Sequence, residues 1–282
     1  VGEDLETATD EEFQRLLAEE NIFARITPSQ KFRLVAGLRR AGAVVAMTGD
    51  GINDAPALKE ADVGVAMGRH STEVAREAAT MVLLDDNFAT VVEALREGRR
   101  VFDSIRRSFR YLVAFHVPIL LSALFLPLLG VPLLLLPVHL VWLELIVHPT
   151  ASLAFSGDIS DPRLMQRPPR NRAEPVLGGC TVAWLAGVGT VVFVGVAGLY
   201  LWALAQGIDV TRARGLALAT LILAATVLVL VECSPQPVWE RRPTGSPFLP
   251  AIILGTLVSL VAVFYVPFLA SLLKVSALPA PD

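Results

Sequence analysis

The chain has 282 residues, of which 54% are hydrophobic and 18% charged, and its formal net charge is −3. This composition is too apolar for an ordinary soluble domain, and we expect no nucleic-acid partner. Residues 1–105 carry 19 acidic and 12 basic side chains, whereas residues 106–282 carry 8 and 12. An acidic first part followed by a basic, apolar second part predicts a cytoplasmic domain and then a domain in the lipid bilayer.

Two further features bound the class of protein. The two cysteines, Cys180 and Cys233, lie in or beside apolar segments without the spacing of a metal site, so we expect no disulfide framework. The sequence begins at Val1 without a basic-then-apolar leader, so we expect no signal peptide and interpret the chain as a fragment.

Three short elements open the chain. Residues 10–20 predict an amphipathic helix, and residues 21–25 predict an apolar strand. A second helix is expected from Pro28 to about residue 40, with Thr27 as its cap. Lys31 lies in the first turn of this helix, where the helix dipole does not favour a cation. Taken alone, it would be a solvated lysine.

The most informative stretch follows residues 43–47, an apolar run that predicts a short buried strand. It reads Thr48-Gly49-Asp50-Gly51-Ile52-Asn53-Asp54-Ala55-Pro56-Ala57-Leu58. Open α/β folds bind ligands at the carboxyl ends of their strands, which is where this loop begins. Asp50 and Asp54 are hard oxygen donors spaced to converge on one Mg²⁺, which takes one or two carboxylates together with waters and phosphate oxygens.

The remaining loop residues suit a phosphate ligand. Asn53 can donate to a phosphate oxygen without adding negative charge. Gly49 and Gly51 allow backbone angles closed to other residues, so the chain can turn sharply and approach a ligand closely. The plain alternative is a polar turn with incidental acids, but turn chemistry alone does not require two acids four positions apart with an asparagine between them.

This loop resembles the hinge motif of P-type cation-transporting ATPases, within the haloacid-dehalogenase-like superfamily. The pattern Phe-Ala-Arg-x-Thr-Pro-x-x-Lys at residues 23–31 precedes it at the spacing of that family. The resemblance implies that Lys31 bridges an upstream phosphoaspartate. It also implies Mg²⁺ as cofactor, ATP as substrate, and two sets of site residues: Lys31, Asp50, Asn53 and Asp54 as catalytic, and Thr48, Gly49 and Gly51 as cofactor-binding.

Alternating strands and helices continue after the loop. Residues 61–68 and 81–84 predict strands, and Ser71 is expected to cap a helix that ends near residue 79. This pattern is typical of a doubly wound, Rossmann-like α/β fold. We therefore expect part of a haloacid-dehalogenase-like phosphorylation domain at residues 1–87, a helical stalk at 88–108, and an all-α membrane bundle at 109–282.

About five membrane spans are expected in the bundle, because five apolar segments each reach the roughly 20 residues that a bilayer requires. They lie near residues 109–129, 133–155, 178–205, 213–232 and 248–273. Arginines crowd the stalk and the loops at 156–177 and 233–247, which places these loops and residues 1–108 on the cytoplasmic side. Arg212 and Arg214 depart from this rule. We expect a multi-pass protein of the plasma membrane.

Polar residues inside the spans are functional candidates, because they are costly in lipid. Glu144 and His148 are four positions apart and so share one helix face. His116 precedes Pro118 in the first span and is a third candidate. These three residues predict an ion or proton site. His139, near the outer end of its span, is expected to be a satisfied interior residue.

The second span also resembles a known segment. Pro137-Val138-x-Leu140-x-Trp142-Leu143 is similar to the start of the sixth transmembrane helix of calcium-pump-like P-type ATPases. In those pumps Asn and Asp ligate the cation at the positions of Glu144 and His148, and Asn and Glu stand at those of His116 and Ile119. The oxygen-rich cage is therefore not preserved. Imidazole with carboxylate suits a transition metal or protonation, and both stay open.

The sequence contains no Asp-Lys-Thr-Gly-Thr or Thr-Gly-Glu-Ser motif, both of which precede this region in the family. We expect an N-terminal half of the pump to supply them, and expect this chain alone to be inactive. One alternative is a non-catalytic membrane or regulatory fragment. Another is a membrane-anchored phosphatase of the same superfamily, but no apolar strand before the acids at residues 3–20 would present its nucleophile.

Overall fold

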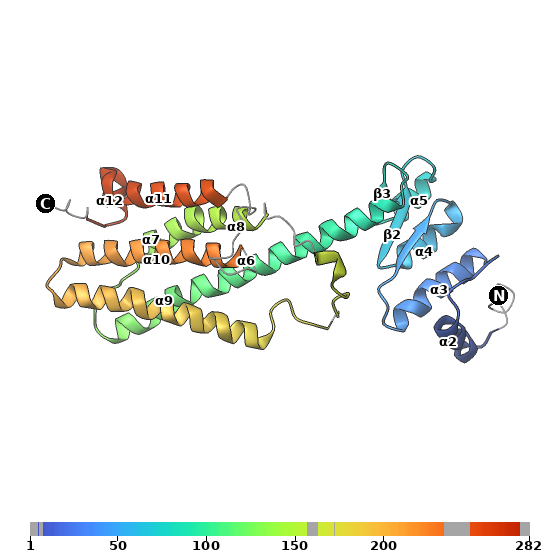
Figure 1. The fold of residues 1–282 in the computed structure, drawn as a ribbon, viewed down its shortest axis with the longest axis horizontal. Coiled ribbons are helices and arrows are strands. Elements are labelled where there is room, and N and C mark those ends of the chain that lie inside the picture. Colours follow the sequence, from blue (N-terminus) through green and yellow to red (C-terminus); the bar gives the residue numbers. More distant parts are fainter. Residues whose placement is uncertain (1–4, 6–7, 157–162, 172, 234–248, 277–282) are drawn as a thin grey trace. The chain divides into compact units, whose positions relative to one another are not determined.

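The computed structural model describes residues 5, 8–156, 163–171, 173–233 and 249–276 (Figure 1). The chain divides into two compact units, Val1–Glu97 and Gly98–Asp282. Helix α6 (Ala89–Leu128) runs through this division and includes most of the expected stalk. The expected boundaries after residues 87 and 108 stay predictions.

A small parallel sheet organises the first unit. Strands β1 (Ala46–Gly49), β2 (Val63–Met67) and β3 (Met81–Leu83) pair in the order β1-β2-β3. Helix α4 (Ala55–Glu60) packs on β1 and β2, and α5 (Glu73–Ala78) packs on β2 and α4. Sequential parallel strands with a helix in each crossover confirm the predicted α/β class.

Two strand predictions were inaccurate. Residues 21–25 form no strand, and Arg25 has a left-handed backbone conformation (φ 57°) that interrupts an extended run. The run at 43–47 was expected to be a buried strand, but β1 begins at Ala46, and Val44 is 63% exposed. Among the described residues β1 pairs only with β2. Its other edge therefore has no strand partner in the described part of the chain.

Helix caps follow the predicted chemistry with one exception. Helix α3 (Pro28–Arg40) is capped by Thr27, whose hydroxyl accepts from the backbone N–H of Gln30, as expected. The exception is α5, which is capped by Thr72 and not by Ser71. Ser71 instead accepts a hydrogen bond from the N–H of Met67 at 2.8 Å. Its hydroxyl therefore ties the end of β2 to the next loop.

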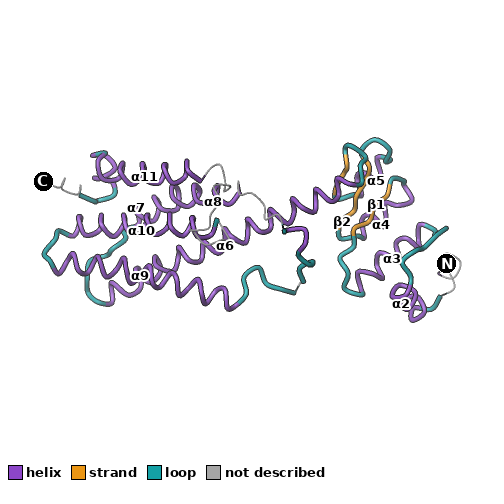
Figure 2. The backbone as a smooth tube through the Cα atoms, in the orientation of Figure 1, coloured by secondary structure: helices purple, strands orange, loops and turns teal. Residues whose placement is uncertain are grey.

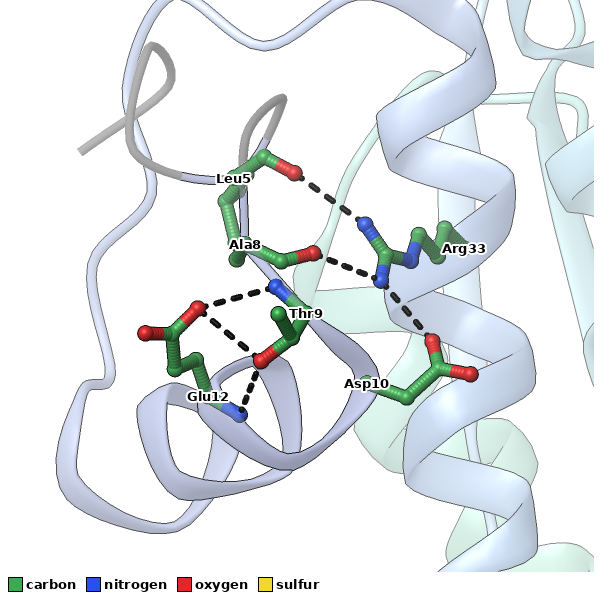
Figure 3. A network of polar contacts seen from close by, with 6 residues as sticks. All are labelled: Leu5, Ala8, Thr9, Asp10, Glu12 and Arg33. Carbon is green, nitrogen blue, oxygen red and sulfur yellow. Dashed lines mark hydrogen bonds and ion pairs between the residues drawn. The ribbon is translucent and has the colours of Figure 1, made fainter.

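Arg33 fastens the N-terminal segment to α3 (Figure 3). Its guanidinium donates to the carbonyls of Leu5 (3.1 Å) and Ala8 (3.2 Å) and to the carboxylate of Asp10 (3.0 Å). The same group lies 4.2 Å from the centroid of the Phe13 ring, on helix α2 (Asp10–Glu19). These contacts fix the surroundings of the helix that carries the predicted catalytic lysine.

The second unit is helical (Figure 2). Besides the continuing α6, the unit contains α7 (Pro137–Trp142), η2 (Leu143–Val147), α8 (His148–Ser156), η3 (Leu164–Gln166), α9 (Gly179–Ala205), α10 (Val210–Glu232), α11 (Leu249–Tyr265) and α12 (Pro267–Leu272). Helix α10 packs against α9, α11 and α8, and a large apolar core lies among them. A helical bundle after an α/β part is the predicted fold class.

Within the described part of the chain, three helices are long and apolar enough to cross a membrane, namely α6, α9 and α10. The second expected span, 133–155, is helical from Pro137 to Ser156 but contains the π-helical segment η2. The fifth, 248–273, is divided into α11 and the short α12. The loop expected at 233–247 lies almost wholly outside the described residues. Five spans therefore remain a prediction.

Polar side chains at one end of the bundle are paired with backbone groups. His139 is fully buried, and its Nε2 donates to the carbonyl of Leu273 at 2.5 Å while its Nδ1 accepts from the N–H of Leu136 at 3.1 Å. It is a satisfied interior residue, as expected. Arg214 donates from Nε to the carbonyl of Leu133 at 2.8 Å, which gives a structural reason for an arginine at this end.

Two charged residues of α6, Arg99 and Asp103, have partners in the segment around η3. Arg99 donates to the carbonyls of Leu164 and Arg167, each at 2.9 Å. Arg167 in turn pairs with Asp103 at 3.2 Å. These contacts hold the segment around η3 against α6, so the basic character of this stretch serves local packing as well as charge placement.

Candidate functional site

The first candidate site is the loop after β1, in the first unit. The strand ends at Gly49, a short 3₁₀ turn, η1, covers Ile52–Asp54, and α4 follows directly. The side chains of Thr48, Asp50 and Asn53 are exposed, whereas Asp54 is buried. The backbone carbonyl of Asp50 accepts from the N–H of Thr72 at 2.9 Å. The loop is therefore anchored by its backbone while three of its polar side chains face outward.

Lys31 and Asp54 form the central contact of this site. The ammonium Nζ of Lys31 lies 2.5 Å from Oδ1 of Asp54, and Oδ2 of Asp54 accepts from the N–H of Gly51 at 3.4 Å. Lys31 is brought to the loop by the first turn of α3, and Asp54 is only 6% exposed. A charge-assisted bond to a buried carboxylate restricts where the ammonium can lie.

Gly49 and Gly51 were both expected to adopt backbone angles closed to other residues, but the structure gives them different roles. Neither has a positive φ, and that of Gly51 is −105°. A Cβ added at Gly49, however, would lie 2.5 Å from Cβ of Asp54, whereas one at Gly51 would meet nothing closer than 3.8 Å. Gly49 is therefore needed for close approach to Asp54, and the expected use of unusual backbone angles is wrong for both positions.

The donor groups fit a magnesium ion at Asp50. Both oxygens of Asp54 are already engaged, one by Lys31 and one by the loop backbone. The Asp50 carboxylate is exposed at the carboxyl end of β1. One carboxylate, with waters and phosphate oxygens, is a sufficient protein contribution for Mg²⁺.

The second candidate site lies in the second unit, where three predicted residues come together. His116 on α6 places Nε2 3.0 Å from Oε1 of Glu144, and His148 places Nδ1 3.0 Å from Oε2 of the same carboxylate. One ligand atom from each residue lies within 4.8 Å of the other two. The three side chains thus form one compact cluster of two imidazoles and a carboxylate.

A π-helical segment shapes this cluster. Glu144 lies in η2, and His148 is the first residue of α8. Such segments are rare and occur frequently at functional sites. Pro149 follows immediately, while α6 continues as a helix through Pro118. Pro149 therefore lies close to the irregular segment, whereas Pro118 lies within a regular helix.

Two aromatic residues that sequence reasoning missed support the histidines. Tyr111 and Phe115 are almost fully buried on α6, and their ring centroids lie 5.5 and 5.2 Å from that of His148. The rings of His116 and His148 are themselves 5.1 Å apart. The spacing Tyr111-Phe115 is four residues, so a shared helix face was the signal available in the sequence.

A cavity of about 600 Å³ adjoins the cluster. Glu144 and His148 line it together with Ser104 and Ser108, which precede His116 on α6 at four-residue steps. Arg100 lies one further step away and also lines the cavity. The cluster is therefore accessible from a partly polar space along one face of α6.

Comparison with known proteins agrees with both units. Residues 132–282 match the family model described as cation transporting ATPase, C-terminus, and residues 33–95 match the one described as haloacid dehalogenase-like hydrolase. The chain is 34% identical to the "Calcium-transporting ATPase" of Bacillus subtilis over 284 residues, covering 100% of this chain and 32% of the relative.

Two other relatives show the same pattern. The "Probable cation-transporting ATPase F" of Mycobacterium tuberculosis is 34% identical over 274 residues, covering 96% of this chain and 30% of the relative. The "Calcium-transporting ATPase 1" of Yarrowia lipolytica is 32% identical over 282 residues, covering 100% and 30%. The chain thus spans about a third of the length of these relatives.

An α/β part that matches haloacid dehalogenase-like hydrolases, followed by apolar helices that match the C-terminal region of cation-transporting ATPases, defines the class of membrane protein. The chain belongs to the cation-transporting P-type ATPases and corresponds to their C-terminal part. It is a multi-pass membrane protein with a haloacid-dehalogenase-like part.

Proposed function

We propose that this chain is the C-terminal segment of an ATP-driven cation pump. In this proposal its first unit helps to hold Mg²⁺ and the transferring phosphoryl group, and its second unit carries part of the ion pathway. The observation that carries the proposal is the Lys31–Asp54 pair at 2.5 Å beside the exposed Asp50 at the carboxyl end of β1. In this arrangement the Lys31 ammonium and the Asp50 carboxylate would serve one ligand.

Each residue of the loop has a distinct part in the proposal. Asp50 would hold Mg²⁺, which supplies neutralisation of charge on the phosphoryl oxygens. Lys31 stabilises the same charge through its ammonium. Asp54, which the sequence suggested as a second magnesium ligand, orients Lys31 and adds negative charge near the metal without the need for a direct bond.

Asn53 and the start of the loop complete the phosphate side of the site. The exposed amide of Asn53 can donate to a phosphoryl oxygen. The hydroxyl of Thr48 would contribute a donor close to the same ligand, Gly51 would hold the Asp54 carboxylate through its N–H, and Gly49 allows Asp54 to approach the end of β1. These residues bind and orient, whereas the phosphorylated aspartate would come from a preceding segment of the pump, so the chain alone is expected to be inactive.

In the second unit, His116, Glu144 and His148 are the proposed cation site. Their convergence at 3.0 Å supports this role, because ionisable groups inside membrane spans normally mark ion pathways. We further propose that residues 1–108 are cytoplasmic and that the protein lies in the plasma membrane. Helix α6 extends from residue 89 to the cation site, and we propose that it couples the two activities.

The test uses the full-length protein in membranes. Asp50→Asn should abolish phosphoenzyme turnover while cation binding persists, because the carboxylate serves the metal and not the cation site. Glu77→Gln, which removes an exposed acid from α5, is the matched control and should leave both unchanged. Loss of cation binding with intact turnover in Asp50→Asn would overturn the assignment.

Measurements on the same full-length protein also distinguish the two alternative functions from a pump. A non-catalytic regulatory fragment would show no phosphoenzyme with or without Asp50, and the reading frame upstream would contain no Asp-Lys-Thr-Gly-Thr. A membrane-anchored phosphatase would hydrolyse phosphate esters without stimulation by any cation. The intact set of Lys31, Asp50, Asn53 and Asp54 favours the pump, since an inert remnant has no chemical need for these four residues.

A further inference from the structure

The donor atoms of the His116–Glu144–His148 cluster narrow the class of cation. Two are imidazole nitrogens and the third is a carboxylate oxygen. Ligand atoms around a tetrahedral ion with bonds of 2.0–2.2 Å lie roughly 3.3–3.6 Å apart. The two nitrogen–oxygen separations of 3.0 Å and the overall limit of 4.8 Å are close to this spacing. Small changes of the side-chain torsion angles, within the same rotamers, would bring the three atoms to three positions of such a shell.

A backbone carbonyl sets the orientation of His116. Nδ1 of His116 lies 2.8 Å from the carbonyl oxygen of Leu112. Because a carbonyl can only accept, Nδ1 carries the hydrogen. Nε2 is therefore the atom that faces Glu144. Metal-binding histidines characteristically donate their other N–H to such a group, which fixes the tautomer and the ring orientation.

Packing sets the orientation of His148. Its side chain is only 12% exposed, and its ring lies against those of Tyr111 and Phe115. Since Nδ1 points to Glu144, rotation of the ring would disturb both aromatic contacts. Glu144 is the most exposed member of the cluster at 48%, so the carboxylate can move to accommodate an ion while the two rings hold their places.

The side chains that this chain supplies do not suit Ca²⁺, which takes six to eight oxygen ligands. Ile119 and Val147 lie three residues after His116 and Glu144 and are 8% and 5% exposed. Their side chains offer no oxygen. Among the described residues, Glu144 supplies the only carboxylate of the cluster. Imidazole nitrogen is instead a preferred ligand of Zn²⁺ and its neighbours in the first transition series.

We infer that the cargo is a divalent transition-metal ion of the Zn²⁺ and Co²⁺ kind, bound by Nε2 of His116, the carboxylate of Glu144 and Nδ1 of His148. The statement that this ion is transported rests on the proposed function. Metal binding at the three side chains needs no ATP and is independent of that function. The described residues supply three ligands, so water or a group from the rest of the pump completes the coordination.

The experiment measures metal binding by the full-length, tag-free protein in detergent without ATP. Co²⁺ should bind at one site per chain and give the visible absorption of a four- or five-coordinate ion, and Zn²⁺ should displace it. His116→Asn and His148→Asn should each weaken Co²⁺ binding by on the order of 100-fold, by analogy with the 10–100-fold loss when even an outer-shell partner is removed. His70→Asn is the matched control, because His70 is exposed in the first unit, and should change nothing.

The outcomes separate this inference from the proposed function. Co²⁺ binding in the unsubstituted protein tests it even if a variant fails to fold. If Ca²⁺ binds and drives phosphorylation through Glu144 while Co²⁺ and Zn²⁺ do not bind, the transition-metal inference fails and the pump remains. If no metal binds and phosphorylation follows pH alone, the cargo is a proton and the inference again fails. Absence of phosphoenzyme under all cations would overturn the proposed function instead.

A substitution that changes the ligand class provides a second readout. His148→Asp replaces a nitrogen donor by a carboxylate, which prefers harder cations. The ratio of Zn²⁺ to Ca²⁺ affinity should fall by at least tenfold in this variant. An unchanged ratio would contradict direct ligation by His148.

Discussion

The two candidate sites are built in contrasting ways. The loop after β1 takes all but one of its functional residues from eleven consecutive positions, and Lys31 completes it through a single 2.5 Å contact. The cluster in the second unit joins His116 of α6 to Glu144 and His148 of the following span. Local turn chemistry defines the first site, whereas helix packing defines the second.

The loop site should lose most of its activity when the Lys31 ammonium is removed. Lys31→Ala should reduce the rate of phosphoenzyme formation by about 10²–10³-fold, the usual effect of losing one electrostatic stabiliser of a transition state. It also leaves Asp54 buried without its ammonium. Rapid-quench phosphorylation of the full-length protein measures the rate. Lys59→Ala, at an exposed lysine of α4, should retain it. A loss of less than tenfold in Lys31→Ala would mean that Lys31 does not contact the phosphoryl group.

The cation site should fail in a different way. Glu144→Gln keeps the size of the side chain but removes the charge that both histidines face. The cation concentration for half-maximal ATPase stimulation should rise by more than tenfold, while the phosphorylation rate at saturating cation changes little. Titration of ATPase activity against cation measures both. A fall in that rate with unchanged cation affinity would place Glu144 outside the cation site.

The close approach of Gly49 to Asp54 can be tested by adding a methyl group at each loop glycine. Gly49→Ala places a methyl group 2.5 Å from Cβ of Asp54, and overpacking of this kind costs about 1–3 kcal/mol. Gly51→Ala meets no atom closer than 3.8 Å at an ordinary φ of −105°, so it should be neutral or slightly stabilising. Denaturant unfolding of the two variants gives the difference. Equal stabilities would show that Asp54 moves away without cost.

The smallest effect is expected for side chains that belong to neither site. Arg33→Met removes the hydrogen bonds to Leu5, Ala8 and Asp10 and should cost about 1–2 kcal/mol, since such bonds to a charged group contribute modestly. Arg15→Met breaks only the exposed pair with Glu19 and should change stability by less than about 0.5 kcal/mol. Thermal unfolding compares the two. A larger effect of Arg15→Met would mean that the three hydrogen bonds of Arg33 do not stabilise the folded state.

The sequence by itself determined the order of elements wherever the local signal was strong. Thr27 and Pro28 announce α3, and the apolar runs around β2 and β3 are bounded by glycine, aspartate and polar turns. It was misleading at 21–25, because an apolar composition does not provide a strand partner. The start of β1 was predicted too early for a related reason. The strand lies at the edge of the described sheet, and Val44 before it is exposed.

Only the tertiary structure shows which of the predicted site residues lie in contact. The motif predicts that Asp50 and Asp54 serve one metal ion, and that assignment stays a prediction; the structure adds that Asp54 is paired with Lys31 while Asp50 is exposed. Spacing placed Glu144 and His148 on one face, but neither the π-helical segment nor the approach of His116 could be read from it. Such contacts join residues from different elements. Their geometry depends on how helices pack against one another, which no local pattern of residues specifies.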